Sequence, residues 1–256
     1  MSEAPLKDWL EQDGALLRLR LARPKANLID AAMIAALSAA LARHRAAPGL
    51  RAALLDSEGP HFSFGASVEE HLPAQCAAML ASLHALVREM LAWPAPILVA
   101  IRGQCLGGGL EVAMSGSLLF AAPDAQFGQP EIRLGVFAPA ASCLLPLRVG
   151  QAVAEDMLLS GRSLAAAQAL ASGLVCELGD DPAALATSWF EQNLRDKSAS
   201  SLALALEAVR APYRAQADRR IGEVERLYLD VLMKTEDANE GLNAFVERRP
   251  PRWAHR

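Results

Sequence analysis

Aromatic residues and metal-binding motifs are scarce in this sequence. Only 5% of the 256 residues are aromatic whereas 52% are hydrophobic, so a core must be built largely from Ala, Leu and Val. The spacing of the cysteines, with no CxxC pair and no Cys/His cluster, argues against a metal site and favours reduced thiols. We therefore expect no bound metal and a cytoplasmic protein. The four cysteines are Cys76, Cys105, Cys143 and Cys176.

Strong charge of one sign and long apolar runs are also missing. The formal net charge of −4 argues against a chain-wide basic surface for nucleic acid or anionic membrane. No uninterrupted apolar run approaches the ~20 residues that a membrane-spanning helix needs. Residues 1–14 are polar and carry acids, so we expect neither a secretory signal nor a transit peptide there. The chain is expected to bind neither nucleic acid nor membrane.

Short apolar runs alternate with segments of helical periodicity over most of the chain. Leu17, Leu19 and Leu21 alternate with arginines, which predicts a hairpin of 6–9 with 15–21 that buries one face. Asp30 is a candidate helix cap. This alternation of strands and helices predicts an α/β sheet core. We expect further strands at 52–55, 97–101, 118–121 and 174–176, and helices at 31–44, 73–91 and 110–114.

Amphipathic helical patterns without strand signals fill the C-terminal part of the sequence. In residues 219–233, apolar residues recur at helical spacing and include Tyr228. We expect a main unit at residues 1–196 and a helical region at 197–256 that caps the core or contacts other subunits. The basic end could meet phosphate or RNA, although a solvated tail is the simpler interpretation. Its arginines are Arg248, Arg249, Arg252 and Arg256.

Three glycine-containing segments could carry chemistry. HFSFGAS at 61–67 and LGGGLE at 106–111 each follow an apolar strand, and FGQPE occupies 127–131. Glycines let a ligand approach the backbone, and a helix start offers free N–H donors, although a tight turn explains three glycines equally well. Glu111 and Glu131 suit general acid–base chemistry if they share a pocket, whereas each alone is more often a surface acid.

Taken in order, these segments resemble the crotonase, or enoyl-CoA hydratase/isomerase, family. The match includes RPKAN at 23–27, FSFGAS, LGGGLE and AQFGQPEIRLG at 125–135, and therefore covers nearly the whole chain. The resemblance implies a crotonase-like ββα spiral core of the α/β class. It also implies a C-terminal helical region for oligomerisation, a homotrimer or a homohexamer, and an acyl-CoA thioester substrate. Coenzyme A would enter as part of that substrate, with no other cofactor.

The resemblance also assigns roles to individual residues. The N–H groups of Phe64 and Gly108 would form an oxyanion hole for the thioester oxygen. Glu111 would take a proton from water and a protonated Glu131 would deliver one to carbon, which requires separated pKa values. Retention of both acids favours water addition over isomerisation. The coenzyme A moiety would contact Lys25, Ala26, Ala66 and Ser67, the last of which replaces the aspartate usual in that loop.

The segment after Glu131 departs from the pattern of family hydratases. Pro139 stands where a glycine N–H usually helps to hold the catalytic water, and proline has no N–H. Phe137, Ala138 and Ala141 make this wall more apolar than usual, which suits a compact ring, although simple repacking would also explain it. We expect Phe137, Ala138 and Pro139 to line the substrate pocket. The combination of FSFGAS, CLGGGLE and FGQPEIRLGVFAPAASCLLP most resembles the family members that hydrate a cyclic dienoyl thioester. That resemblance implies a hydroxyl at the β-carbon and a proton at the γ-carbon.

Several alternatives stay open at this point. Hydration of a straight-chain 2-enoyl-CoA or double-bond isomerisation would use the same motifs. A non-catalytic acyl-CoA- or RNA-binding scaffold would keep the fold without the chemistry. Cys105 and Cys143 flank the site segments, but buried fillers are the better interpretation because no paired base can be named. None of the five histidines is assigned a catalytic role, including His61 beside the first loop and His71 beyond it.

Overall fold

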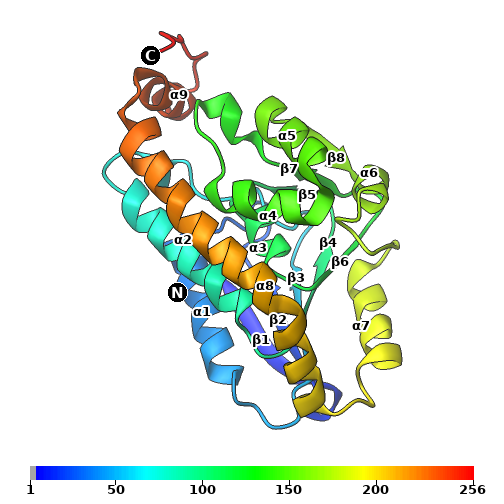
Figure 1. The fold of residues 1–256 in the computed structure, drawn as a ribbon. Helices are drawn as coiled ribbons and strands as arrows, with labels where there is room; N and C mark the ends of the chain where they lie inside the picture. The colour runs from blue at the N-terminus through cyan, green and yellow to red at the C-terminus, as the bar shows by residue number, and fades with distance from the viewer. Residues whose placement is uncertain (1–3) are drawn as a thin grey trace.

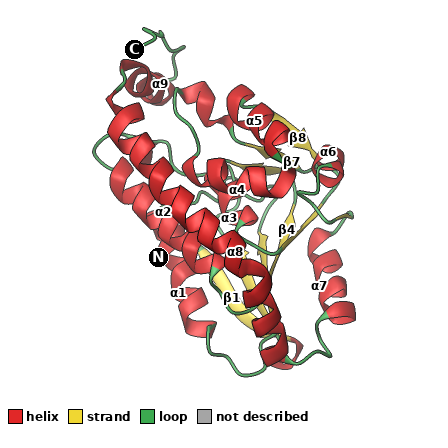
Figure 2. Cartoon of the chain, viewed as in Figure 1, coloured by secondary structure: helices red, strands yellow, loops and turns green. Residues whose placement is uncertain are grey.

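The computed structural model describes residues 4–256 and has a mixed α/β architecture (Figures 1 and 2). Residues 1–3 lie outside the described residues. They belong to the expected 1–196 unit and to the N-terminal segment that we expect to lack a targeting signal. Helices pack around two sheets, and the last helix lies at the top of Figure 1, where it is followed by a non-helical tail that ends the chain. The predicted α/β alternation is confirmed.

The main sheet has six strands in the order β1-β2-β3-β4-β6-β9. β1 pairs with β2 in antiparallel fashion, as the predicted hairpin requires, and the other neighbours are parallel. Two strands match their predicted bounds, whereas the strand expected at 174–176 lies at 177–178, where the backbone pairs with β6. The strands are β1 (Leu6–Glu11), β2 (Leu16–Leu21), β3 (Ala52–Ser57), β4 (Ile97–Ile101), β6 (Leu118–Ala121) and β9 (Glu177–Leu178).

A second, three-stranded sheet carries the loops of the candidate site. Its order is β5-β7-β8, and its strands are β5 (Gln104–Leu106), β7 (Gln126–Gly128) and β8 (Ser163–Ala165). An isolated bridge between Ser63 and Cys105 attaches the 61–67 segment to β5. The two glycine-rich segments are therefore neighbours through backbone pairing, although they are far apart in sequence.

Nine α-helices cover the sheets in the described part of the chain. The side chain of Asp30 accepts a hydrogen bond from Met33 N, so the predicted cap of α1 is confirmed. α8 runs beside α2 across the front of the molecule (Figure 1). The helices are α1 (Ala31–His44), α2 (Cys76–Leu91), α3 (Gly108–Met114), α4 (Pro139–Val149), α5 (Gln151–Ser160), α6 (Ala166–Ala171), α7 (Pro182–Asn193), α8 (Ala199–Arg226) and α9 (Glu236–Val246).

Short helical turns occupy several of the connections. A π-helical turn, η4 (Leu227–Val231), follows α8 directly and is continued by the 3₁₀ turn η5 (Leu232–Lys234). The other 3₁₀ turns are η1 (Gln12–Gly14), η2 (Glu69–His71) and η3 (Pro130–Leu134). η2 and η3 lie in the segments that carry the predicted site residues, so the site is built mainly from loops and short turns.

The hairpin differs from its prediction because β2 is covered on both faces. Leu16, Leu17 and Leu19 are all buried, and Arg18 is only 8% exposed. Arg18 is tolerated there because its guanidinium lies 2.9 Å from the carboxylate of Asp56, which also pairs with Arg20. The alternation of Leu and Arg therefore indicates a buried ion pair and not a solvated face.

The basic C-terminal end is exposed, as the solvated-tail interpretation requires, but it is also held against α9. Arg249 pairs with Glu240, and the backbone N–H groups of Ala254 and His255 donate to Asp237. Trp253 lies close to Gly135, just beyond η3. The tail is therefore anchored beside the turn that carries Glu131.

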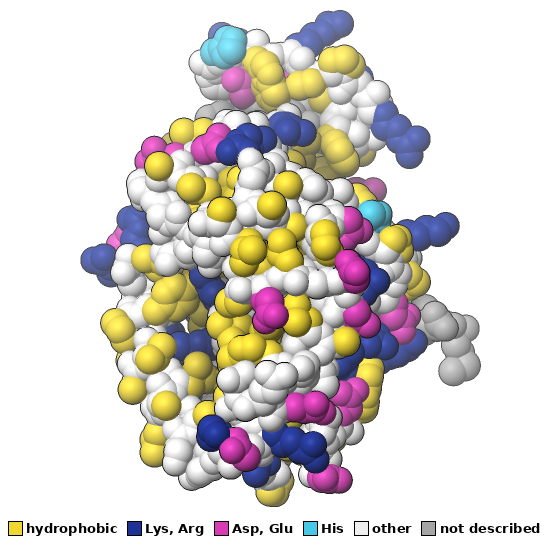
Figure 3. Space-filling view, turned by 90° about the vertical axis from the view of Figure 1, so that its right-hand side faces the viewer, with side chains coloured by type: hydrophobic (Ala, Val, Ile, Leu, Met, Phe, Trp, Pro, Cys, Tyr) yellow, Lys and Arg dark blue, Asp and Glu magenta, His cyan; other side chains and the backbone are white. Residues whose placement is uncertain are grey.

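The surface supports the charge argument made from the sequence. On the face shown in Figure 3, acidic and basic side chains are interspersed around apolar ones, and no continuous basic band crosses it. Among residues 4–256, no helix combines the length and apolar character needed to cross a membrane.

Candidate active site

Buried polar contacts join the 23–29 turn to the 61–67 segment. The Asn27 side chain donates to the carbonyl oxygens of Glu58 and His61, and Ser63 Oγ donates to Asn27 O at 2.8 Å. Gly65 N in turn donates to Ser63 Oγ at 3.1 Å. Asn27 and Ser63 are buried, so these bonds are shielded from water and fix the loop backbones.

Two glycine-rich loops meet without intervening side chains. A Cβ on Gly108 would lie 3.2 Å from Ala66 N, and a Cβ on Gly65 would lie 3.0 Å from Leu106 O. These spacings are closer than ordinary contacts, so glycine is what permits the approach. The N–H groups of Ala66 and Gly108, for which the described residues provide no acceptor, lie on adjoining loops.

Phe64 does not offer the free N–H that the sequence analysis expected. Its N–H donates to Ala26 O at 2.9 Å and is therefore already used within the fold. The expectation that Phe64 and Gly108 act together is thus contradicted on the Phe64 side. Ala66, which was expected to contact coenzyme A, has the N–H that lies beside Gly108.

Glu111 is buried on α3 and is held by the start of α4. Glu111 is only 3% exposed, and its Oε1 accepts a hydrogen bond from Ala141 N at 2.8 Å. Burial raises the pKa of Glu111 to about 7, while the hydrogen bonds from Ala141 and Ala140 act in the opposite direction. A carboxyl with this pKa can exchange protons near neutral pH.

Glu131 lies on η3 and faces the second glycine loop. A Cβ on Gly107 would lie only 2.5 Å from Glu131 Oε1, so the absence of that Cβ makes room for the carboxyl group. With its nitrogen turned toward Glu131, the Gln129 amide lies 3.0 and 3.2 Å from the two carboxyl oxygens. Burial, and then the charge of Glu111, raise the pKa of Glu131 to about 8. The two predicted acids are therefore close enough to interact electrostatically.

A small cavity opens beside Glu131. Its volume is about 70 Å³. Phe137, Ala138 and Pro139 were expected to line the substrate pocket, but they lie outside this cavity's wall, and Leu134 and Val136 take that place. The lining residues are Phe64, Gly65, Ala66, Val68, His71, Gly107, Pro130, Glu131, Leu134 and Val136.

His71 belongs to this cavity although the sequence analysis gave it no role. Its Nδ1 lies 2.8 Å from Ser67 O, so the neutral ring carries its proton on Nδ1. Burial lowers the pKa of His71, which favours that neutral form. The only sequence signal was its position four residues after Ser67, since a helical turn brings such residues together.

The four residues expected to contact coenzyme A lie on two adjoining loops. Lys25 is exposed, whereas Ala26, Ala66 and Ser67 are half-buried. Lys25 has a positive φ of 97°, and the turn around it packs against Gly59. Ala26 is tied to the 61–67 segment through the bond from Phe64 N. An exposed lysine beside these loops provides a cation at the mouth of the site.

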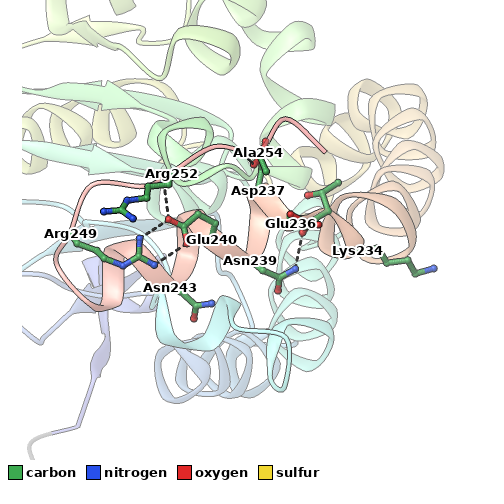
Figure 4. A pocket seen from close by; sticks show the side chains of 10 residues that line it. Lys234, Glu236, Asp237, Asn239, Glu240, Asn243, Arg249, Arg252 and Ala254 are labelled. Carbon is green, nitrogen blue, oxygen red and sulfur yellow. Dashed lines mark hydrogen bonds and ion pairs between the residues drawn. The ribbon is translucent and has the colours of Figure 1, made fainter.

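A larger hollow of about 720 Å³ lies elsewhere, between α9 and the C-terminal tail (Figure 4). Its basic side chains are largely matched by acidic ones, as in the pair Arg249–Glu240. It lacks the glycine loops and the buried acids. Size alone therefore does not make it the candidate active site, and we assign the smaller cavity beside Glu131.

The two buried thiols next to the site segments are poor nucleophiles. Burial raises the pKa of the Cys105 and Cys143 thiols, which disfavours the reactive thiolate. Within residues 4–256, no group of three or more His, Cys, Asp or Glu side chains is arranged to hold a metal.

Comparison with known proteins shows the family. Residues 11–256 match the enoyl-CoA hydratase/isomerase family. The chain is 64% identical over 258 residues to cyclohexa-1,5-dienecarbonyl-CoA hydratase of Thauera aromatica, with 100% of both sequences covered. It is 33% identical to a probable enoyl-CoA hydratase of Mycobacterium bovis, covering 96% of this chain and 97% of that one.

Solved structures agree with the sequence comparison. The crystal structure of an enoyl-CoA hydratase/isomerase from Pseudoalteromonas atlantica superposes with a TM-score of 0.85 at 26% identity, covering 98% of this chain and 100% of that chain. The predicted fold class is therefore confirmed, including the C-terminal helical region. By sequence match and by fold, the chain belongs to the enoyl-CoA hydratase/isomerase family.

Proposed function

We propose that this protein is a hydro-lyase that adds water to cyclohexa-1,5-diene-1-carbonyl-CoA and forms 6-hydroxycyclohex-1-ene-1-carbonyl-CoA. The observation that carries the proposal is 64% identity, over the full length, to a protein described as that hydratase. Glu111, which is buried, and Glu131, which is half-buried and lines the small cavity, interact electrostatically and supply suitable acid–base groups. The reaction would belong to the breakdown of benzoyl-CoA.

The thioester oxygen would be held by the N–H groups of Ala66 and Gly108. As water attacks the β-carbon, negative charge moves onto this oxygen, and two fixed N–H donors stabilise it. The closeness of the two loops and the use of Phe64 N elsewhere support this pair over Phe64 and Gly108. Losing one such donor typically costs about 3 kcal/mol of transition-state stabilisation.

Glu111 and Glu131 would divide the proton transfers between them. An ionised Glu111 takes a proton from water as its oxygen bonds to the β-carbon, and a protonated Glu131 gives a proton to the γ-carbon. The lower pKa of Glu111 and the higher pKa of Glu131 support this assignment. After one turnover the two groups have exchanged protonation states, and proton exchange with solvent restores them.

The lining of the cavity supports an apolar acyl group. Val68, Leu134 and Val136 offer apolar contacts, and Glu131 is the acid among them. A ring held there would expose its γ-carbon to the proton donor, whereas coenzyme A would extend toward Lys25, Ala26 and Ser67.

The assigned roles predict a bell-shaped dependence of kcat/KM on pH. Below about pH 7 Glu111 gains a proton and cannot act as a base, and above about pH 8 Glu131 loses its proton and cannot act as an acid. We expect a maximum between these values, measured as initial rates with the cyclic dienoyl thioester. The apparent pKa values of the two sides of this pH profile belong to the coupled pair of glutamates and not to one residue. A flat profile across both values would contradict the assignment.

We further propose that residues 1–196 form the catalytic unit and that residues 197–256 organise a homotrimer or homohexamer. Leu204 and Val209 on α8 are 72% and 76% exposed, which leaves apolar surface for a second subunit to cover. α9 and the tail meanwhile contact the Glu131 turn, because a Cβ on Gly241 would lie 2.1 Å from Leu134 O. The C-terminal helical region would thus both form the subunit contacts and hold the turn that carries Glu131.

Product analysis in deuterium oxide tests the proposed reaction. The purified protein is incubated with cyclohexa-1,5-diene-1-carbonyl-CoA, and the product is separated by chromatography and analysed by NMR. We expect 6-hydroxycyclohex-1-ene-1-carbonyl-CoA with deuterium at the former γ-carbon. Migration of a double bond without gain of water would instead indicate an isomerase, and binding without any product would indicate a scaffold.

A further inference from the structure

Tyr228 is a buried polar residue that the sequence motifs do not include. The residue is 0% exposed, and its hydroxyl has no hydrogen-bond partner of normal geometry in the described part of the protein. The Cys76 thiol is its polar neighbour, and a thiol is a weak partner. Because most buried polar groups are paired, an unpaired hydroxyl suggests a use outside the fold itself.

The backbone around Tyr228 is also unusual. It lies in the π-helical turn Leu227–Val231 that follows α8, where the helix widens by one residue. Such turns are rare and occur often at functional sites, since they redirect a side chain without ending the helix. The turn therefore places a residue of the C-terminal helical region toward the core.

The surroundings of Tyr228 belong to the candidate active site. Its ring lies edge-to-face on Phe137, with ring centres 5.2 Å apart, and it packs in one cluster with Val136, which lines the cavity. Burial, and then the nearby Cys76, Glu131 and Glu111, raise the pKa of Tyr228. The hydroxyl thus stays protonated over the working pH range, so it can donate a hydrogen bond but does not transfer its proton.

The attacking water needs a donor that the neighbouring helix start does not provide. Pro139 has no N–H, and the N–H groups of Ala140 and Ala141 are directed at Glu111. The N–H of Ser142 closes the helix on Ala138 O at 2.9 Å. The N–H groups in the first turn of α4 therefore donate to Glu111 or within the helix, and none is left for the attacking water.

We propose that Tyr228 is a further catalytic residue, whose hydroxyl donates a hydrogen bond to the water oxygen activated by Glu111. The same bond then holds the new hydroxyl group of the product. No bond to Tyr228 forms or breaks, because the proton of water passes to Glu111 and Tyr228 keeps its own. This inference rests on the proposed hydration, and it gives the unpaired hydroxyl its partner.

The substitution Tyr228→Phe tests the proposal because it removes one oxygen and keeps the ring on Phe137. We expect kcat to fall about 10- to 100-fold, as for loss of one good hydrogen bond, while KM changes little. The thermal midpoint should stay the same or rise, since an unpaired buried hydroxyl is removed. A kcat within about twofold of the wild type would overturn the proposal, and so would a fall in kcat that only accompanies unfolding.

Tyr213→Phe is the matched control. Tyr213 is the only other tyrosine in the sequence, and its hydroxyl is also buried without a partner among residues 4–256. Its ring, however, packs on Arg148 and not on the site. Its kcat should equal that of the wild type. An equal loss in both variants would show a general packing effect and would overturn the catalytic role.

The choice of substrate separates this inference from the proposed function. If the wild type hydrates crotonyl-CoA and not the cyclic diene, the proposed substrate fails, and the same pair of variants is assayed on crotonyl-CoA. Water attack occurs in both reactions, so the expected loss for Tyr228→Phe is unchanged. If the wild type hydrates neither thioester, both the proposed function and the role of Tyr228 are overturned.

Discussion

Glu131→Gln should lower turnover of the cyclic dienoyl thioester about 10³-fold, within the usual range for loss of a general acid. Glutamine has nearly the same shape as glutamic acid but cannot supply the proton that carbon must receive. Binding of the product thioester should change little, because the cavity and the oxyanion donors remain. Single-turnover rates and calorimetric binding measure the two effects separately.

Glu177→Gln provides the control for Glu131→Gln, because Glu177 is an exposed acid on β9. It should turn over like the wild type.

The pH dependence of stability provides a second check. The pKa of Glu131 is raised from 4.5, its value in the unfolded chain, to about 8 in the folded protein. Its contribution to the free energy of unfolding is therefore complete below pH 4.5 and is lost as the pH rises through about 8. The Glu131→Gln variant should therefore lose less stability than the wild type between pH 4.5 and about 8. Unchanged turnover in this variant would contradict the catalytic role of Glu131.

Gly107→Ala should reduce turnover by about 100-fold or more, the effect expected when a catalytic group is displaced by about an ångström. The new Cβ would lie 2.5 Å from Glu131 Oε1 and would force the carboxyl group out of position. Gly107 also has φ 51° and ψ −129°, a conformation that side chains disfavour by about 1–3 kcal/mol. Steady-state kinetics and thermal unfolding of the purified variant measure both consequences.

Gly49→Ala separates backbone strain from displacement of Glu131. Gly49 has a positive φ of 74°, but a Cβ there would meet nothing within 4 Å. This variant should lose some stability and keep its kcat. If Gly107→Ala and Gly49→Ala have the same small effect on kcat, the contact between Gly107 and Glu131 does not matter for the reaction.

Long strands and helices could be predicted from the sequence, whereas the second sheet could not. The apolar runs of β4 and β6 are bounded by turn residues, and their predicted limits match the structure. β5, β7 and β8 have three residues each, too few for a periodic pattern to emerge. Leu174 and Val175 are buried, but burial alone does not make a strand, and pairing with β6 begins only at Glu177.

The candidate site was likewise predicted only in part. Glu111 and Gly108 are recognisable because the glycine run and the acid lie together in one short segment. Whether an N–H is free depends on distant residues, and Phe64 loses its donor to Ala26, which no local pattern reveals. His71 and Tyr228 come from segments without a motif, and only folding brings them to the site region.

The ratio of kcat/KM for cyclohexa-1,5-diene-1-carbonyl-CoA to that for crotonyl-CoA tests the central claim most directly. Both thioesters are assayed with the same purified protein at a pH between about 7 and 8, where the acid and the base are in their working forms. The account predicts a ratio of about 100 or more, because the proton donor is assigned to the γ-carbon of the conjugated diene, whereas hydration of crotonyl-CoA needs the proton at the α-carbon. A ratio below one would contradict it and would assign the protein to straight-chain enoyl-CoA hydration.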